Sequence, residues 1–268
     1  MKKFLIILIS LLILIIPSLS LGDDKSDNII ISIRYLPFAF IEYEGEGART
    51  TEYDTWENKV KSHNPVTEIE LDYALTQESS INFKYLTNFS TIDYEASSSG
   101  LQYNDVIMKV RNFSTHYIRS LENSNLKGIF GLQHFQQVFQ RSNFFLYPDE
   151  EIDFNTKEVI KASGLNFGVT GRYFSPVYFD FEFISGIMLH TTNRQTSDSS
   201  TLDCKGYTYR LKLETGVDFG DFTAGIGALR ELYHPQVKGG ASTDDIVYSY
   251  SQNKTDLMGF YLFATYNY

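Results

Sequence analysis

The feature that most constrains the fold is the stretch from residue 207 to residue 219, which reads YTYRLKLETGVDF. Large apolar side chains stand at positions 207, 209, 211, 213, 217 and 219, and the residues between them are mostly polar or small. Successive side chains of a β-strand point to opposite faces, so this spacing predicts a long strand with one apolar face and one polar face. The fold must therefore offer two different environments, one on each side of a sheet.

The same period of two recurs in nine other segments, which gives ten strands in all, although eight or twelve would also fit the weaker patterns. The nine lie at about residues 29–43, 68–75, 81–85, 106–118, 128–138, 165–174, 177–189, 222–232 and 259–268. Pro37 is disfavoured inside a ladder because it has no N–H to donate. A phase slip near Asn112 predicts a β-bulge there.

The connections between these segments alternate in length along the chain. Four of them are tight, and the other five, at about residues 44–63, 92–104, 140–163, 191–205 and 234–254, are long and polar. Every second connection of an antiparallel meander lies at the same end of the sheet, so one rim receives the tight turns and the other the long loops. This arrangement, with an even strand count, is typical of bacterial outer-membrane barrels. The predicted fold class is an all-β, up-and-down antiparallel transmembrane β-barrel.

The beginning of the chain predicts export. Lys2 and Lys3 precede an apolar run at residues 4–16, and Pro17 and small residues follow, which is the order of a secretory signal peptide. We expect a signal peptide at residues 1–22 and one barrel domain at residues 23–268; an uncleaved anchor is the alternative. Without Lys2 and Lys3, 21 Lys and Arg remain against 33 Asp and Glu, a formal charge of −12. Such an acidic surface disfavours nucleic acid as a partner.

Alternation alone also fits a secreted soluble β-sandwich or barrel, with its apolar face packed in a core. Two observations favour lipid instead. The alternating segments reach 10 to 15 residues, close to what a tilted membrane strand needs. Tyrosines gather toward strand ends, where the ring can lie at the lipid boundary and the hydroxyl can meet water. We therefore expect a location in the bacterial outer membrane, with outer-membrane lipid as a partner.

The polar faces of the strands carry charges of both signs, which we expect to pair across a narrow lumen. Ten strands enclose a bore only slightly wider than that of eight-stranded barrels, which side chains fill. The predicted lumen charge network consists of Arg34, Glu70, Asp72, Lys84, Arg172, Asp180, Glu182, Arg210, Lys212 and Glu214. Glu68, Lys109, Arg111 and Asp218 are assigned to the same faces.

The chain ends on GFYLFATYNY, an uncharged alternating strand. We expect this strand to pair with the first one, which would close the cylinder and leave no free edge. Phe260, Leu262, Tyr266 and Tyr268 lie on one face. This ending resembles the C-terminal membrane-insertion signal of outer-membrane proteins, which ordinarily finishes in Phe or Trp, so Tyr268 departs from it slightly.

Ten strands with five long outer loops resemble the omptin family of outer-membrane proteases. The resemblance implies an endopeptidase that uses an acid pair and an Asp-His pair at the loop end, with water as the nucleophile. Asp93 and Glu95, in the sequence DYE, are the candidates for the acid pair, and His190 is the candidate histidine. The second acid is Glu, and Met188 stands two residues before His190 where the family pattern has Asp.

The sequence favours a non-enzymatic surface protein, either a structural barrel or adhesin with exposed loops, or a narrow porin-like pore. An extracellular ligand or a host surface would then meet the loops. The five histidines are scattered singly, with no metal-ligand spacing, and we expect no metal and no cofactor. The omptin-like endopeptidase and the secreted soluble binding protein remain alternatives.

Overall fold

The structure is a computed structural model, and it describes residues 29–49, 54–88, 91–92, 101–122, 124–146, 150–152, 156–175, 177–195, 201–237, 240–243 and 246–268. Within these ranges ten long strands form a closed antiparallel barrel. They are β1 (Ile29–Arg49), β2 (Asp54–Thr76), β3 (Ser79–Asn88), β5 (Leu101–Ser120), β6 (Leu126–Leu146), β8 (Thr156–Ser175), β9 (Val177–Gln195), β10 (Thr201–Asp218), β11 (Phe222–Val237) and β13 (Ile246–Asn267). The predicted fold class and strand number are confirmed.

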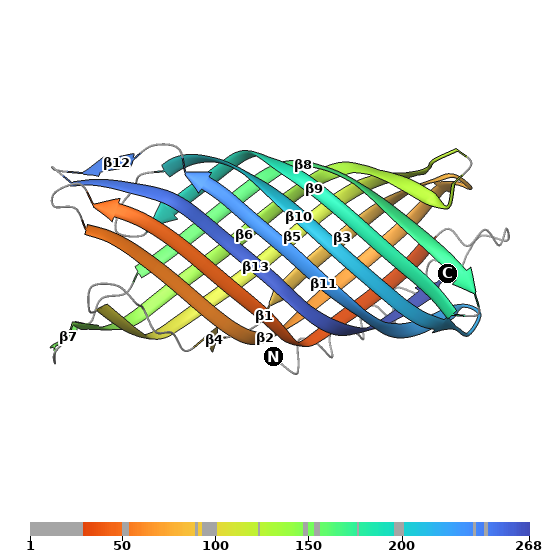
Figure 1. Cartoon of the computed structure of the whole chain (residues 1–268), viewed down its shortest axis with the longest axis horizontal. Coiled ribbons are helices and arrows are strands. Elements are labelled where there is room, and N and C mark those ends of the chain that lie inside the picture. The colour runs from red at the N-terminus through yellow and green to blue at the C-terminus, as the bar shows by residue number, and fades with distance from the viewer. Residues whose placement is uncertain are drawn as a thin grey trace.

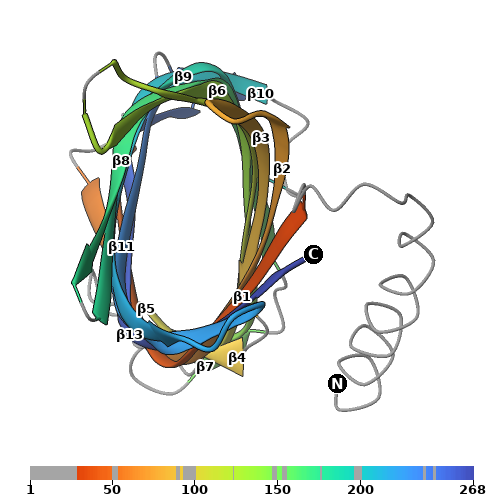
Figure 2. The same cartoon turned by 90° about the vertical axis from the view of Figure 1, so that its right-hand side faces the viewer.

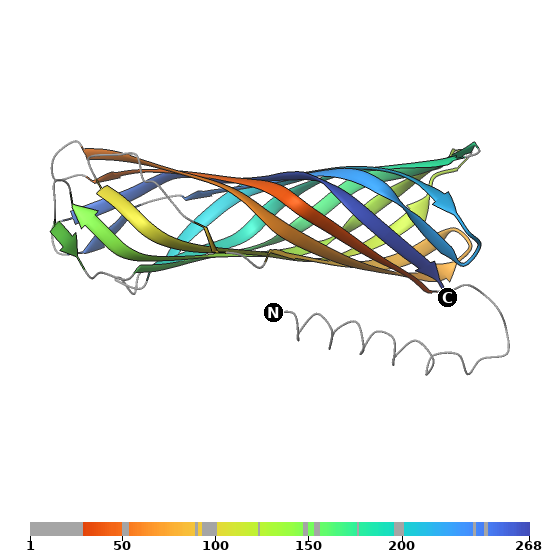
Figure 3. The same cartoon turned by 90° about the horizontal axis from the view of Figure 1, so that it is seen from below.

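Each long strand pairs with its neighbours in chain order, and β13 closes the sheet against β1. Ile31 lies opposite Tyr266 and Tyr35 lies opposite Leu262 in this closing pair, which is visible from below in Figure 3. Viewed along its axis, the barrel has an oval cross-section (Figure 2). Because the sheet closes on itself as one cylinder, the alternative of a two-sheet sandwich disagrees with the structure.

The two rims of the barrel differ as expected, but the loops are shorter than the sequence suggested. At the turn end, β2 and β3 are separated only by residues 77 and 78, and β10 and β11 by residues 219–221. Gly220, with φ of 89°, makes the second of these turns possible. At the other rim, the loop end, the short strands β7 (Glu150–Ile152) and β12 (Gly240–Thr243) extend the wall, whereas β4 (Thr91–Ile92) lies lower, opposite Val106 and Ile107 of β5. Figure 1 shows β7 and β12 at the rim far from the C-terminus.

Residues 44–63 were predicted as a loop, yet most of them belong to β1 and β2, which run to Arg49 and begin at Asp54. A strand of about 20 residues rises about 3.3 Å per residue and is tilted by about 45°, so it climbs roughly 45 Å. The apolar band of an outer-membrane barrel is only about 25 Å tall. The barrel wall is therefore roughly 20 Å taller than the apolar band that it contains.

The outward face of the turn-end half is apolar. Leu132 is 61% exposed and Phe260 is 83% exposed. Other large apolar side chains on this outer surface include Phe83, Phe113, Tyr117, Phe130, Phe167, Phe179, Phe183, Ile187, Leu211, Leu213, Ile226 and Leu262. A water-soluble protein rarely exposes an apolar surface of this extent, and a lipid-facing barrel requires one. This outward surface also disagrees with the alternative of a soluble barrel.

Two predicted irregularities have different outcomes. The pairings of β1 shift register between Leu36 and Ala39, around Pro37, as expected for a residue that cannot donate to the ladder. The predicted bulge near Asn112 is wrong, because β5 pairs with β3 and β6 in unbroken register through that point. Lys109 and Arg111 were also assigned to the lumen face incorrectly: both are exposed, while Met108 and Val110 are buried inside.

The apparent phase slip has a physical cause. Between residues 113 and 117 the outward face of β5 carries Phe113 and Tyr117 and the inward face carries Ser114 and His116, whereas from Met108 to Arg111 the apolar residues face inward and the charged ones outward. The register of β5 is unchanged at this point, and only the polarity of its inward and outward faces is exchanged. In the part of the chain that the structure describes, no helix is long and apolar enough to cross a membrane.

Candidate functional site

The inward face at mid-height of the barrel carries a layer of buried charged side chains, which we call the ion-pair layer. It joins the β1–β2–β3 side of the lumen to the β9–β10–β11 side, across the barrel interior. Its members are Arg34, Lys84, Arg210 and Lys212, together with Glu68, Glu70, Glu182, Glu214 and Glu231. The alternation of side chains along each strand directs these residues into the lumen. On β10, for example, Arg210, Lys212 and Glu214 occupy successive inward positions.

Arg34 of β1 holds three carboxylates together. Its Nε donates to Glu214 Oε1 at 2.5 Å, and its Nη1 donates to Glu68 Oε1 at 3.1 Å and to Glu70. Glu214 comes from β10, on the other side of the β1–β13 pair that closes the barrel. Arg34 therefore connects strands that are distant in the sequence. Its side chain is only 3% exposed, and a guanidinium in such a setting is stable only when its donors are paired.

Arg210 of β10 does the same across the lumen. Its Nη1 and Nη2 donate to the two oxygens of Glu68 at 2.6 and 2.8 Å, a bidentate pair. Its Nε donates to Glu182 Oε1 at 2.7 Å, and its Nη1 also donates to Glu231. Glu231 accepts a further hydrogen bond from the hydroxyl of Tyr233. One cation thus satisfies three buried carboxylates.

Two lysines complete the layer. Lys84 of β3 donates to Glu182 and lies 3.6 Å from Glu70 Oε1. Lys212 lies 3.2 Å from Glu214 Oε2 and 3.8 Å from Asp180 Oδ1. The layer as defined contains four cations and five carboxylates, so one negative charge has no counterpart within it.

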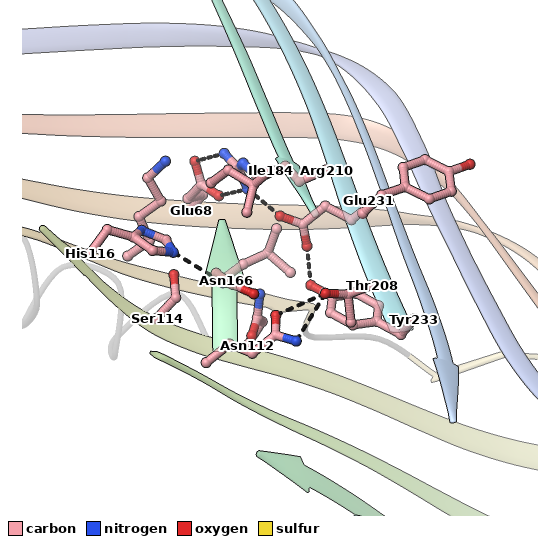
Figure 4. Close-up of a pocket in the computed structure, with 14 residues that line it drawn as sticks. Glu68, Asn112, Ser114, His116, Asn166, Ile184, Thr208, Arg210, Glu231 and Tyr233 are labelled. Carbon is pink, nitrogen blue, oxygen red and sulfur yellow. Dashed lines mark hydrogen bonds and ion pairs between the residues drawn. The ribbon is translucent and has the colours of Figure 1, made fainter. Parts of the chain in front are cut away.

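Above the ion-pair layer, toward the loop end, neutral polar side chains cross the lumen (Figure 4). Asn166 Nδ2 lies 3.0 Å from His116 Nε2, and Gln133 Nε2 donates to Thr208 Oγ1 at 2.9 Å. These groups line a small cavity of about 20 Å³. Buried polar atoms at its edge, Asn166 Oδ1 and Asn112 Oδ1, have no hydrogen-bond partner among the described residues, and a space of this size suits one water molecule.

Higher still, the lumen is filled by apolar and aromatic side chains. Phe135 of β6 stacks on Tyr233 of β11 with ring centroids 4.0 Å apart. Thr255 donates to Gln137 Oε1 at 2.8 Å beside them. The same buried cluster includes Leu36, Ile41, Val66, Leu86, Met108, Val110, Met188 and Leu257. Three successive layers, ionic, polar and apolar, therefore occupy the lumen above mid-height.

Below the ion-pair layer the lumen holds a cavity of about 610 Å³ that reaches the turns. Gly225 and Gly227 of β11 make room on the adjoining wall for Phe263 and Tyr261, since a Cβ at Gly227 would lie 2.3 Å from Tyr261 Cζ. The small inward positions of this Gly-Ile-Gly sequence thus permit close aromatic packing.

The structure brings together most residues of the predicted lumen charge network. Arg34, Glu70, Lys84, Glu182, Arg210, Lys212 and Glu214 belong to the ion-pair layer, and Asp180 borders it. Arg172 pairs with Asp180 through Nε and Oδ2 at 3.0 Å, and Asp72 lines the wide cavity. Glu231 was missed, although it continues the inward series of Gly225 and Gly227 at a period of two. Asp218 lies exposed at the turn, where it accepts a hydrogen bond from Gly220 N.

Of the three candidate protease residues, the structure describes only His190. Asp93 and Glu95 lie outside the described residues, so their relation to His190 stays a prediction. His190 lies opposite Ser163, which in turn lies opposite His134 on β6. His134 alternates with the inward-facing Gln133 and Phe135, so this row, including the exposed His190, faces outward. Among the described residues, no group of three or more His, Cys, Asp or Glu side chains could hold a metal ion.

Comparisons with known proteins place the fold. The outer membrane protease OmpT from Escherichia coli matches with a TM-score of 0.65 over 93% of this chain and 99% of that chain, at 11% sequence identity. The fold is that of a bacterial outer-membrane barrel. The translocator domain of the autotransporter NalP from Neisseria meningitidis and a Pseudomonas aeruginosa FadL homologue match with TM-scores of 0.38 and 0.34, at 8% identity each. They cover 94% and 90% of this chain and 92% and 90% of theirs.

Family models give no match to the chain, and no curated protein matches it in sequence. At 11% identity the likeness to OmpT is a likeness of fold, and the same fold can carry unrelated functions.

Proposed function

We propose that this protein is a closed barrel of the bacterial outer membrane, whose strand extensions and loops bind a partner outside the cell, and that it neither conducts solutes nor cleaves peptides. In this proposal the apolar band lies in lipid, the turn end faces the periplasm and the loop end faces outward, which is the orientation of outer-membrane barrels.

The observation that carries the proposal is the filling of the lumen. Arg210 bridges Glu68 on one side to Glu182 and Glu231 on the other, and the Phe135–Tyr233 stack lies above this bridge. A solute would have to separate buried ion pairs and then pass through an apolar layer. Breaking a buried pair costs about 3–5 kcal/mol, so the filling favours a binding role over a narrow pore.

The outward face just beyond the apolar band supports the membrane placement and outer-membrane lipid as a partner. Arg111, Gln136 and Lys161 lie side by side in register on β5, β6 and β8. Lys109, the next outward residue of β5 toward the loop end, is also exposed. Cations at this level would meet the phosphates of lipid headgroups, each contributing about 1 kcal/mol near an anionic surface.

The first experiment separates a closed barrel from a pore. The mature chain, refolded and inserted into a planar lipid bilayer, should give no discrete conductance steps. As a positive control, a variant with both barriers removed, Arg210→Ala with Phe135→Ala, should conduct if it remains folded. Steady single-channel conductance from the unmodified protein would contradict the proposal.

The second experiment tests binding outside the cell. Vesicles that carry the barrel should adhere to one of a panel of immobilised probes, such as heparin, collagen or laminin, more strongly than empty vesicles. Replacing residues 93–100, which connect β4 to β5, with a short Gly-Ser linker should reduce adhesion. Equal adhesion of barrel-bearing and empty vesicles across the panel would remove the support for an adhesin.

The omptin-like endopeptidase is tested with a peptide library and the variants Asp93→Ala, Glu95→Ala and His190→Ala. We expect no cleavage by the unmodified barrel in the presence or absence of outer-membrane lipid. Cleavage that disappears in these three variants would overturn the non-enzymatic proposal.

A further inference from the structure

The cavity at the turn end, of about 610 Å³, has one closed end and one open end. Arg34, Glu70, Glu182, Lys212 and Glu214 of the ion-pair layer form its closed end. Ser124 and Asn125 of the turn between β5 and β6, with the first two residues of β6, form part of its rim. Volumes of about 300–1,000 Å³ are typical of small-molecule sites, and a molecule could reach this one only from the turn end.

Most charged groups in the lining already have partners. Arg34 and Lys212 bind Glu70 and Glu214, Glu182 is bound by Lys84 and Arg210, and Arg172 is bound to Asp180. Two charges are left over. In the described part of the chain, Lys127 and Asp72 line the cavity and neither takes part in an ion pair.

The cationic wall is built on three neighbouring strands. Ser120, Lys127 and Thr170 lie directly opposite one another on β5, β6 and β8 and share the inward face. Arg172 is the next inward residue of β8. Its side chain is 50% exposed, its Nε is bound to Asp180, and its guanidinium lies 5.2 Å from the centre of the Tyr178 ring. Among the described residues its terminal nitrogens have no hydrogen-bond partner, so they are available together with Lys127 Nζ.

The acidic wall comes from another strand. Asp72 is half-buried on β2, four strands away from β8 around the barrel. Asp180 on β9 does not belong to this wall, because it lies directly opposite Arg172 and is bound to it. The cavity thus holds a cationic pair, Lys127 and Arg172, and an acid on a separate wall, with water-accessible space between them.

We propose that this cavity binds a small zwitterion of amino-acid or dipeptide size. The carboxylate of the ligand would accept hydrogen bonds from Lys127 and Arg172, and its ammonium group would donate to Asp72. One molecule then neutralises both left-over charges, which neither a simple anion nor a simple cation can do. The site is independent of the proposed adhesion, because it opens at the opposite end of the barrel.

The experiment uses the full mature barrel, refolded in detergent, with glycylglycine as the probe and acetate and methylammonium as half-ligands, measured by calorimetry or saturation-transfer NMR. Glycylglycine should bind more tightly than either half-ligand. Lys127→Met and Asp72→Asn should each weaken glycylglycine binding about tenfold or more, as expected for the loss of a charge-assisted hydrogen bond. Acetate should still compete in Asp72→Asn and should fail to compete in Lys127→Met.

The matched control is Lys161→Met, which removes an exposed lysine from the outward face of β8 and should leave binding unchanged. Heat-modifiable migration on gels checks folding, and the conservative variants Lys127→Arg and Asp72→Glu should retain binding within a few-fold. The proposal is overturned if neither Lys127→Met nor Asp72→Asn alters the affinity, or if acetate or methylammonium binds as tightly as glycylglycine.

Discussion

The two halves of the barrel have opposite polarity, although the same strands build both. In the turn-end half, charged groups such as Arg34 and Glu214 face inward and apolar ones such as Leu132 face outward. In the loop-end half, Val110 and Ile160 face inward and are buried, while Arg111 and Lys161 face outward and are exposed. The first half is organised like a membrane barrel and the second like a water-soluble one.

This inversion shows what each wall is adapted to. Where hydrocarbon surrounds the barrel, the outward side chains supply the apolar surface and the lumen must absorb the charges in pairs. Where water surrounds it, the charges lie outside and the lumen can pack as an ordinary core. The ion-pair layer lies near the height at which the polarity of the two faces is inverted. Substitutions in this layer should therefore have the largest effect on stability.

The largest effect is expected for Arg210→Met. This change leaves Glu68, Glu182 and Glu231 without their shared cation, and an uncompensated buried charge costs about 3–5 kcal/mol. The free energy of unfolding, measured by urea titration of the barrel in lipid vesicles, should fall by that amount, or the variant should fail to fold. Arg172→Met is the matched control: its side chain is half exposed and Asp180 still has Lys212 at 3.8 Å, so this change should cost no more than about 1 kcal/mol.

Phe135→Ala tests the loop-end half as a packed core. Truncating a buried aromatic residue costs about 3–5 kcal/mol in a well-packed interior, and the loss of the stack on Tyr233 adds to it. We expect about 3 kcal/mol in the same titration, because water from the adjoining polar layer can fill part of the space. A loss below about 1 kcal/mol would mean that the loop-end lumen is not a packed core.

Leu132→Arg tests the outward face of the turn-end half. A charged side chain on the lipid face costs about 2–4 kcal/mol at the bilayer midplane and less toward the interface, so we expect about 2 kcal/mol for this position. The opposite exchange, Lys161→Leu in the loop-end half, should change the unfolding free energy by no more than about 1 kcal/mol, the contribution of one cation beside lipid headgroups. Similar costs for the two changes would contradict the inversion.

The sequence predicted the turn-end half well and the loop-end half poorly, and the inversion explains why. The regular pattern in β10 identified the inward series Arg210, Lys212 and Glu214. On β5 the polarity of the two faces is exchanged near Asn112. In a period-two pattern this exchange looks the same as the shift of one residue that a bulge would cause, so the sequence predicted a bulge. The strand ends beyond it looked like loops, since both faces there carry polar residues in many places.

The pairing of charged side chains within the lumen could not be predicted from the sequence, for a different reason. The contacts of Arg34 with Glu214 and of Arg210 with Glu68 join residues 180 and 142 positions apart. Alternation assigns each residue to a face, but the height at which it meets a partner depends on strand register and tilt. The same limit applies to Asp93, Glu95 and His190, whose convergence depends on the loop end.

The smallest effect is expected for Glu231→Gln, and it tests whether the ion-pair layer is balanced. The layer has five carboxylates and four cations, so removing the charge of one carboxylate while keeping its shape leaves four of each. The amide oxygen of the introduced glutamine can still accept a hydrogen bond from Arg210, and its Nε2 can donate to the hydroxyl oxygen of Tyr233. The unfolding free energy should therefore stay within about 1 kcal/mol of the unmodified protein.

Glu68→Gln is the matched comparison for this change. Glu68 is fully buried and accepts hydrogen bonds from both Arg34 and Arg210, so its neutralisation should cost about 2–4 kcal/mol, more than that of Glu231. Five carboxylates crowded around four cations should favour a proton on the least well-paired one, and Glu231, bound by one cation, is that group. An infrared band of a protonated carboxylic acid that disappears in Glu231→Gln and persists in Glu68→Gln would identify it. If the two variants lose equal stability, the excess charge is spread over the layer and Glu231 has no special place in it.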